Sequence, residues 1–455
     1  MSNKNLRPVK VNSNHKFRTN NHNKRIKISG FLQMAEEERS ASYHKVMKRI
    51  SNFRSWSVSN GIQIFDSIRI DARWDDVNKR YSLCIVSTGH LRCFQKLLAI
   101  PITLCLGART CSISKELIAV GLGGGLALNF SIAQELALGP DSYWFDYLSI
   151  LPSRGEQSLP MFWSEQERMY LKGTSLYSLI TMDDQSLADD FELGFGLLRK
   201  FPNFKSGYIN LALYKIAVSI ASSRAFYIDE YFGECLIPWA DIFNHSTHQT
   251  HVKPYCSKSS ERNAFDMDSS EIIMQSVCSV RKHRELFNTF GLQSNSSLLH
   301  KYGFCEFNNK NGFVSIHVPF RKLKRDKNLG AWSEMYEIYS DGRIEHDLVI
   351  FIGYHVSTYR SYAYSNKKEF ILECVSSAKS IFYEQLSKFE IADEENIEMR
   401  NIKARSGHGL LGAAAANMLR NEEIRILKSA IQMVERKGDK LWGKYYRKFD
   451  ELQMQ

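Results

Sequence analysis

The segment LIPWADIFNHS, at residues 236–246, joins an almost unbroken apolar run to an abruptly polar end. Asp241, Asn244 and His245 stand at that end. A strand that only fills a core has no use for an Asn-His pair, because buried polar groups cost free energy unless they find partners. We therefore treat these three residues as candidates for holding a ligand.

Two further segments carry polar residues in a similar setting. SSRAF, at residues 222–226, ends a helical pattern and contains Arg224. RELFNTFGLQSNSSLLHKYGFCEFNN runs from residue 284 to residue 309 and contains Phe290 and Tyr302. We predict that these two segments and the polar end at Asp241 contribute to one site.

Three simpler chemical signals are weak. His245, His248 and His251 have the spacing H-x-x-H-x-x-H, but the intervening residues form a poor helix and supply no fourth zinc ligand, so surface histidines are favoured. GLGGG at residues 121–125 lacks the Lys-Ser/Thr of a phosphate loop and reads better as a lead-in to a helix near Leu126. Nothing in the sequence brings a base or orienting residue to Cys84, Cys93 or Cys111, which disfavours a nucleophilic thiol at these positions.

Taken in order, the three segments resemble the SET-domain protein lysine methyltransferases of the Rubisco large-subunit methyltransferase-like group. That group reads S-R-x-F, then aD-x-x-NHs, then E-x-f-x-x-YG-x-x-SN-x-x-LL-x-x-YGF-v. The upstream segments DSYWFDYLSILP and LPMFWSEQERMYLKGTSL are similar to the marks of the group's helical insert. The likeness runs from about Phe53 to Val318, and PMFW, ELFNTFG and HKYGF are closest to the branch that modifies ribosomal and nuclear proteins.

The resemblance implies methyl transfer from S-adenosyl-L-methionine (SAM) to a lysine of a protein substrate. It assigns Arg224 to the SAM carboxylate. It assigns Asn244 and the backbone of His245 to the amino-acid and adenine parts, Asp241 to support of that loop, and Tyr302 to the aromatic wall along which the lysine slides. Methyl transfer needs a neutral amine placed about 3 Å from the methyl carbon. An apolar channel must therefore desolvate the amine.

Each of these residues also has a purely structural explanation. Asn244 could cap a turn, Arg224 could pair with a structural acid, and Tyr302 could belong to the core. Their joint occurrence, in the right order and at the right intervals, favours the cofactor site.

The sequence departs from the pattern where the group has a Gly-x-Gly loop close to SAM. With the group's register set on Ile100-Pro101, Ser-Leu-Cys at residues 82–84 takes that place, so Leu83 and Cys84 become the candidate cofactor-binding residues. Phe94 and His283 stand at positions where the pattern has turn glycines.

A second departure affects the chemistry directly. The position of the group's catalytic tyrosine is Phe290 in this chain. The absent hydroxyl would orient the amine, and one misplaced hydrogen bond in such a site can cost about 2–4 kcal/mol of barrier. Two functions therefore stay open: an active protein-lysine methyltransferase, or a SET-fold protein that binds a partner without useful turnover.

Charge and composition narrow the class of protein. Of 455 residues, 44% are hydrophobic and 24% charged, which is ordinary for a globular chain. Residues 1–30 carry eight Lys and Arg and no acid, which leaves 52 basic against 49 acidic residues elsewhere. We expect a disordered basic tail over residues 1–35 that either has no partner or binds RNA, a nuclear import system or a ribosomal surface. Nucleic acid is expected to bind through this tail only.

We expect a reduced intracellular protein, a monomer of nucleus or cytoplasm, with no membrane segment and no secretion signal. The nine scattered cysteines form no C-x-x-C pair, so neither a disulfide framework nor a zinc segment is expected. The helical C-terminal region must then close the lysine channel.

The expected fold is α+β. A β-rich SET domain over residues 50–320 contains a helical insert at about 112–225, and a mainly α-helical substrate-binding domain follows over residues 321–455. The segments IQIFDSIRI, YSLCIVS, KLLAIPITL, EIIMQSVCSV and ELFNTF are typical of strands, whereas LALNFSIAQELALG and YKIAVSIASSRAF have helical spacing. Near the C-terminus, Ile424, Leu427, Ile431 and Val434 fall on one helical face.

Overall fold

A computed structural model describes residues 39–75, 80–152, 158–257, 270–318, 335–359, 366–403 and 412–446, with only the backbone described for 390–403. The expected basic tail, residues 1–35, lies outside these ranges. The first described element is a helix over residues 39–59, which ends at the Asn60-Gly61 turn, where Gly61 has a φ of 88°. Within the described ranges, none of the helices has the length and apolar character needed to cross a membrane.

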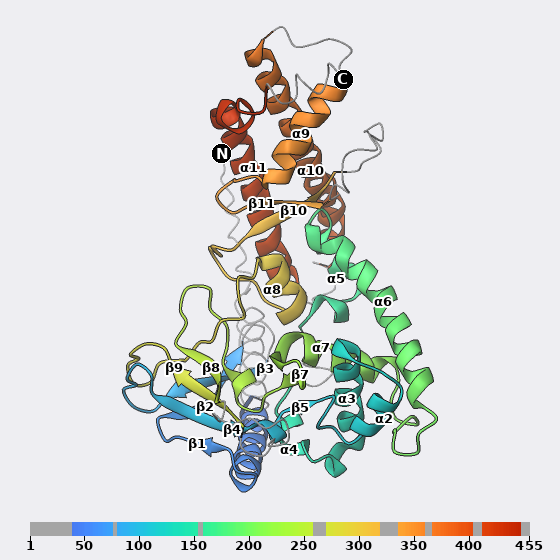
Figure 1. Ribbon diagram of the computed structural model, residues 1–455, viewed down its shortest axis with the longest axis vertical. Helices are drawn as coiled ribbons and strands as arrows, with labels where there is room; N and C mark the ends of the chain where they lie inside the picture. Colours follow the sequence, from blue (N-terminus) through green and yellow to red (C-terminus); the bar gives the residue numbers. More distant parts are fainter. Residues whose placement is uncertain are drawn as a thin grey trace, which may run out of the picture.

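Small antiparallel sheets form the first part of the molecule (Figure 1). Strand β9 shows why these residues form strands, because Ile272, Met274 and Ser276 are buried while the side chains between them are partly exposed. The strands are β1 (Gln63–Ile64), β4 (Lys96–Pro101), β9 (Glu271–Ser276) and β8 (Val252–Ser257) in one sheet; β2 (Ile68–Asp75) and β3 (Arg80–Ser87) in a second; and β5 (Leu106–Gly107), β7 (Gly233–Leu236) and β6 (Ala225–Asp229) in a third.

Helices occupy the insert that the sequence predicted at about 112–225. Helix α3 begins at Gly124, so GLGGG at residues 121–125 leads into a helix. The helix stops at Gly139, whose φ of 55° suits a glycine. The insert contains α2 (Ser114–Ala119), α3 (Gly124–Leu138), α4 (Phe145–Leu148), α5 (Glu165–Arg168), α6 (Ser175–Leu198) and α7 (Leu211–Arg224).

The C-terminal region has its own hydrophobic core and is mainly helical, as expected. It projects away from the sheets, with α8 (Asn295–Tyr302) at the junction (Figure 1). Its helices are α9 (His346–Tyr359), α10 (Lys367–Lys403) and α11 (Ala413–Trp442). On α11, Leu427, Ile431 and Val434 are buried and Ile424 packs against the same core. The region also contains an unpredicted antiparallel pair, β10 (Phe313–His317) and β11 (Met335–Tyr339).

A buried polar contact fixes α11 to the insert. The carboxylate of Glu423, fully buried, accepts hydrogen bonds from the backbone N–H of Ser175 at 3.1 Å and from its hydroxyl at 2.7 Å. Arg420 donates to the backbone carbonyl oxygens of Lys172 and Phe389. Because Glu423 caps the first N–H of α6 and Arg420 binds the segment before it, the C-terminal region is anchored directly to the insert.

One strand prediction is wrong. ELFNTF, residues 285–290, forms only isolated bridges, Val86 with Glu285 and His245 with Asn288. Its backbone changes partner along the segment: Leu286 N–H donates to Ile85 on one side, whereas Asn288 N–H donates to Asn244 on the other. A segment that alternates between two neighbours cannot build a continuous ladder.

The expected glycine replacements do lie in glycine-like conformations. Phe94 has a φ of 62° and His283 a φ of 61°. Side chains rarely adopt this left-handed region, since Cβ crowds the neighbouring backbone there. The sequence comparison with the family pattern therefore located two turns correctly.

Candidate functional site

One cavity of about 270 Å³ lies between the sheets, the insert and α8. This volume is close to the lower end of the range for small-molecule sites. Six of the eight predicted site residues line it, from four separate segments of the chain: Leu83, Arg224, Asp241, Asn244, Phe290 and Tyr302.

A buried acid and an arginine form the polar floor of the cavity. Arg224 is the last residue of α7, and its Nη1 donates to the backbone oxygen of Asp241 at 3.0 Å and lies 3.4 Å from Oδ2. Tyr147 donates its hydroxyl hydrogen to the same Oδ2 at 2.8 Å. Burial raises the pKa of Asp241, and Arg224 and Tyr147 oppose that rise. Asp241 thus connects α7 to Tyr147 of the insert, while its buried Oδ1 has no hydrogen-bond partner among the described residues.

Asn244 connects strand β3 to the segment that carries Glu285 at the edge of the cavity. Its Nδ2 donates to the backbone oxygen of Leu83 at 3.3 Å and to Oε1 of Glu285 at 2.8 Å. Glu285 also pairs with Arg73 on β2. These bonds hold the Asn244 side chain against β3, at the place where the sequence register put the missing glycine loop.

The aromatic side of the cavity is a stack of three rings. Phe290 stacks on Tyr302 with ring centroids 4.5 Å apart and planes inclined by 23°. On its other face Phe290 stacks on His245 at 5.0 Å and 22°. Tyr302 ends α8, and Gly303 follows with a φ of 79°; a Cβ there would overlap Ser158. This close approach packs the Tyr302 end of α8 against Ser158 beside the cavity.

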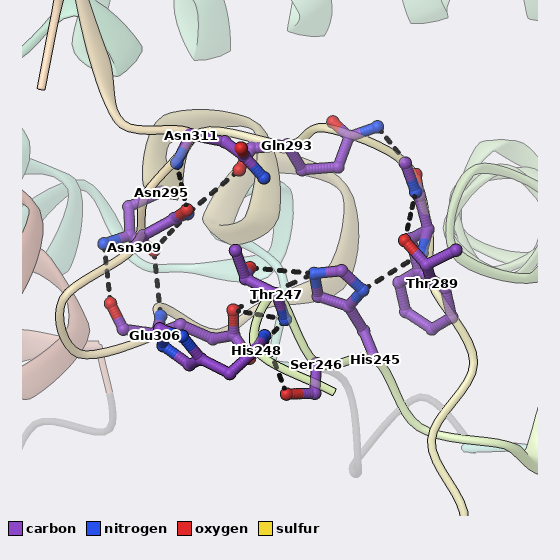
Figure 2. A network of polar contacts seen from close by, with 12 residues as sticks. His245, Ser246, Thr247, His248, Thr289, Gln293, Asn295, Glu306, Asn309 and Asn311 are labelled. Carbon is purple, nitrogen blue, oxygen red and sulfur yellow. Dashed lines mark hydrogen bonds and ion pairs between the residues drawn. The ribbon is translucent and has the colours of Figure 1, made fainter. Parts of the chain in front are cut away.

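The His245 side chain does not line the cavity but supports it from behind. Its Nδ1 accepts a hydrogen bond from the backbone N–H of Phe290 at 3.0 Å, so in the neutral ring the proton lies on Nε2. Nε2 then donates to Thr247 Oγ1 at 3.2 Å, a contact drawn in Figure 2. Burial lowers the pKa of His245, which favours this neutral form.

A wider polar network fixes the same segments (Figure 2). The carboxylate of Glu306 accepts from the backbone N–H of Thr247 at 3.1 and 3.0 Å. Asn295 donates to the backbone oxygen of Glu306 at 2.9 Å, and Gln293 donates to that of Phe290 at 3.0 Å. The loop that carries Phe290 is therefore tied both to the His245 segment and to the segment that follows α8.

Cys84 is the second candidate, after His245, that does not line the cavity. It is 2% exposed within the core, and burial raises the pKa of its thiol to about 12. Since successive side chains of a strand point to opposite faces, Leu83 and Cys84 cannot both face the cavity. His248 and His251 contact different segments. His248 contacts the backbone oxygen of Phe307, and His251 accepts a hydrogen bond from the backbone N–H of Phe287.

Several lining or supporting residues were not predicted. Arg49, Asp75, Arg80 and Tyr81 line the cavity, and no motif of the sequence marked them. Tyr147 supports Asp241 from within DSYWFDYLSILP, and Glu285 is the first residue of the E-x-f-x-x-YG pattern, so both lay in segments that had already been singled out.

Comparison with known proteins supports the architecture. No family model matches the chain. Mouse N-lysine methyltransferase SETD6 is 25% identical over 277 residues, which cover 56% of this chain and 54% of that protein. Zebrafish setd6 is 26% identical over 299 residues, or 60% of each. The chain thus matches the curated relatives over about half of their length.

Solved structures match over most of the chain. The SET domain of LSMT bound to lysine and AdoHcy has a TM-score of 0.68 at 18% identity, covering 87% of this chain and 92% of that one. Rubisco LSMT bound to AdoMet has a TM-score of 0.64 at 19% identity. The chain therefore has the α+β fold of SET-domain proteins. Within that class, its similarity is to SETD6 in sequence and to Rubisco LSMT in structure.

Proposed function

We propose that this chain is a SAM-dependent protein-lysine N-methyltransferase. The observation that carries the proposal is the convergence of Arg224, Asp241, Asn244, Phe290 and Tyr302 on one cavity. These residues were selected from segments far apart in the sequence, so their meeting is independent support for the cofactor site. The names of the SETD6 relatives point to the same reaction.

The residues present fit the amino-acid end of SAM, which carries a carboxylate and an ammonium group. The Arg224 side chain is 24% exposed and offers a guanidinium for the carboxylate. The buried Oδ1 of Asp241 has no hydrogen-bond partner among the described residues and belongs to a residue that lines the same cavity, so it is an acceptor for the ammonium group of SAM. Asn244 is held in place by two hydrogen bonds from its Nδ2, and its side-chain oxygen accepts no hydrogen bond from the described residues, so it is an acceptor for the ligand.

The aromatic wall would prepare the lysine. When bound, SAM supplies an electrophilic methyl group. The Phe290 and Tyr302 rings exclude water from the amine and so lower its pKa toward the neutral, nucleophilic form. Burial raises the pKa of Tyr302, which keeps its hydroxyl protonated as a hydrogen-bond donor to the substrate. The neutral His245 fixes the backbone of Phe290 and with it the width of the wall.

Phe290 supports a second candidate, a SET-fold protein that binds SAM and a partner without turnover. Calorimetry of the purified full-length chain with SAM, followed by labelled-methyl transfer to ribosomal and nuclear extracts, separates the two. Binding with transfer supports the enzyme, and binding without transfer supports the inactive protein. Absence of both would refute both.

Finer features extend the proposal. We propose a ribosomal or nuclear protein as the substrate, and a monomer that works in the nucleus or cytoplasm. The likeness of PMFW, ELFNTFG and HKYGF to the ribosomal and nuclear branch supports this substrate class, and the basic tail suits both compartments. Methylated bands in the labelled extracts, identified by mass spectrometry, would test the substrate.

A further inference from the structure

Two loops beyond β3 and β9 form a second surface feature, which we call the basic ribbon: residues 88–96 and 277–284. The loops run antiparallel and are joined by reciprocal backbone bonds, Leu91 N–H to Val280 oxygen at 2.8 Å and the reverse at 3.1 Å. Buried Ser87 secures the base, because its hydroxyl donates to the Arg281 oxygen at 2.8 Å and accepts from the Arg284 N–H at 3.0 Å. The ribbon is therefore a defined platform: Leu91 and Val280 are buried beneath it, and its arginine side chains are exposed.

The charge on this platform has one sign. Neither loop contains an acidic residue. Arg92, Arg281, Lys282 and Arg284 are exposed, and no salt bridge joins any of them to an acid of the described residues. His90 and His283 are exposed as well. Only Lys96, at the edge of the ribbon, has an acidic partner, Glu271 at 3.7 Å. An unpaired cluster of this kind attracts a polyanion.

Two residues of the ribbon hold strained backbone while exposing a ring. Phe94 has a φ of 62° and its side chain is 70% exposed; His283 has a φ of 61° and is also exposed. Glycine would adopt both conformations without strain. An exposed phenyl ring buries little apolar area, so packing does not account for Phe94 at this position. The ring is thus kept where solvent or a partner meets it.

We propose that the basic ribbon binds single-stranded RNA. Arginine and lysine side chains would neutralise phosphates, and the exposed Phe94 ring would stack on a base, the combination that single-stranded nucleic acid requires. An acidic polypeptide would use the charges but would leave the Phe94 ring without a role. None of the ribbon residues lines the cavity, although Arg284 directly precedes Glu285, which contacts the cavity-lining Asn244.

The test is fluorescence anisotropy of a labelled 20-nucleotide single-stranded RNA of mixed sequence with the full-length chain, at several salt concentrations. Replacing Arg281, Lys282 and Arg284 by Glu should weaken binding by about 10-fold or more and reduce the salt slope by about 2. A matched control reverses three exposed basic residues of α11: Lys428→Glu, Arg436→Glu and Lys440→Glu. The basic tail is present in every variant, so only the difference between the two triple variants counts.

Phe94→Gly separates a binding role from a structural one. It should weaken RNA binding by about 5-fold or more, because stacking is lost. It should also raise the midpoint of thermal unfolding by about 1–2 °C, because the left-handed strain is relieved. A purely structural Phe94 would give a lower midpoint instead.

Three outcomes would overturn the proposal. Equal RNA affinity of the ribbon and control triple variants would leave the tail as the RNA site. Unchanged binding by Phe94→Gly would remove the stacking role. Displacement of RNA by poly-glutamate of equal charge at equal concentration would point to an acidic protein surface as the natural partner.

Discussion

Phe290 and Tyr302 lie ring against ring on the wall of the cavity, with centroids 4.5 Å apart. Phe290 comes from a loop and Tyr302 from the end of α8, and His245 closes the stack from behind. Because a phenyl ring carries no hydroxyl, the Tyr302 oxygen is the polar group that this pair offers to the cavity. The pair therefore has the aromatic surface of two stacked rings but a single hydroxyl group.

Phe290→Tyr should raise the methylation rate by about 10- to 100-fold, since one hydrogen bond placed in the transition state is worth a few kcal/mol. Stability should change by less than about 1 kcal/mol, because the ring already lines a cavity with room beside it. Labelled-methyl transfer under saturating SAM measures the effect. Phe287→Tyr is the control, because Phe287 packs on His251 away from the cavity. An equal rate for Phe290→Tyr and the native chain would show that this position does not limit catalysis.

Arg224→Lys should weaken SAM binding by about 10-fold while keeping the positive charge, because lysine cannot reproduce the planar two-pronged geometry of arginine. Calorimetry well below the unfolding temperature measures the change. Arg109→Lys serves as the matched variant, since Arg109 lies over the Tyr231 ring outside the cavity. If both variants bind SAM like the native chain, Arg224 is not a cofactor residue.

The junction at Glu423 should make stability depend on pH. Burial raises the pKa of Glu423 to about 7 from an ordinary 4.5. The folded state thus holds the proton more tightly than the unfolded chain, so this stabilisation is complete below pH 4.5 and is lost as pH rises through 7. Urea unfolding should show a loss of about 1–3 kcal/mol between pH 5 and pH 8.

Replacing the Glu423 carboxyl group tests whether it causes this dependence of stability on pH. Glu423→Gln keeps a carbonyl acceptor for Ser175 and removes the titration, so it should flatten the pH dependence and be the more stable chain at pH 8. Burial also raises the pKa of Glu422 to about 7, so Glu422 would leave a residual dependence of stability on pH. Glu435→Gln, on an exposed part of α11, should keep the native slope. The same slope in all three proteins would exclude Glu423.

Two glycines of α6 should respond in opposite directions. A Cβ at Gly194 would overlap the buried Phe130 ring, so Gly194→Ala should lower the free energy of unfolding by about 1–3 kcal/mol. A Cβ at Gly196 meets nothing within 4 Å, so Gly196→Ala should raise it by about 0.5–1 kcal/mol through helix propensity. Equilibrium urea unfolding compares them. Equal effects would mean that α6 does not pack on Phe130 as described.

Six residues that line the cavity were identified from the sequence, and the residues that were missed have physical reasons for being hard to predict. Asp241 and Asn244 mark the end of an apolar run, which is a local signal. The partner of Asp241, Tyr147, lies 94 positions away, and no spacing in the sequence announces such a contact. Leu83 and Cys84 were both chosen from one register, but strand alternation admits only one of them to the cavity.

In the fold, too, local sequence patterns predicted some elements, whereas distant contacts determined others. Helical spacing located α3 and α7, although α3 is buried on nearly all sides, Gln134 and Glu135 included, rather than on one apolar face. The pair β10–β11 was missed although MYEIY alternates, because its partner strand precedes a charged stretch that obscures the pairing. ELFNTF has strand composition but serves two neighbours, a tertiary effect that overrides propensity.

The contact of Glu423 with Ser175 bears on how this protein can be divided. A chain cut before α11 would uncover the amino end of α6 and deprive α8, which contacts α11, of a neighbour. The ring at the end of α8 would then lose its alignment, so the part of the chain that carries the cavity should not behave as an autonomous module. A truncated version would be a poor substitute for the intact molecule in screening.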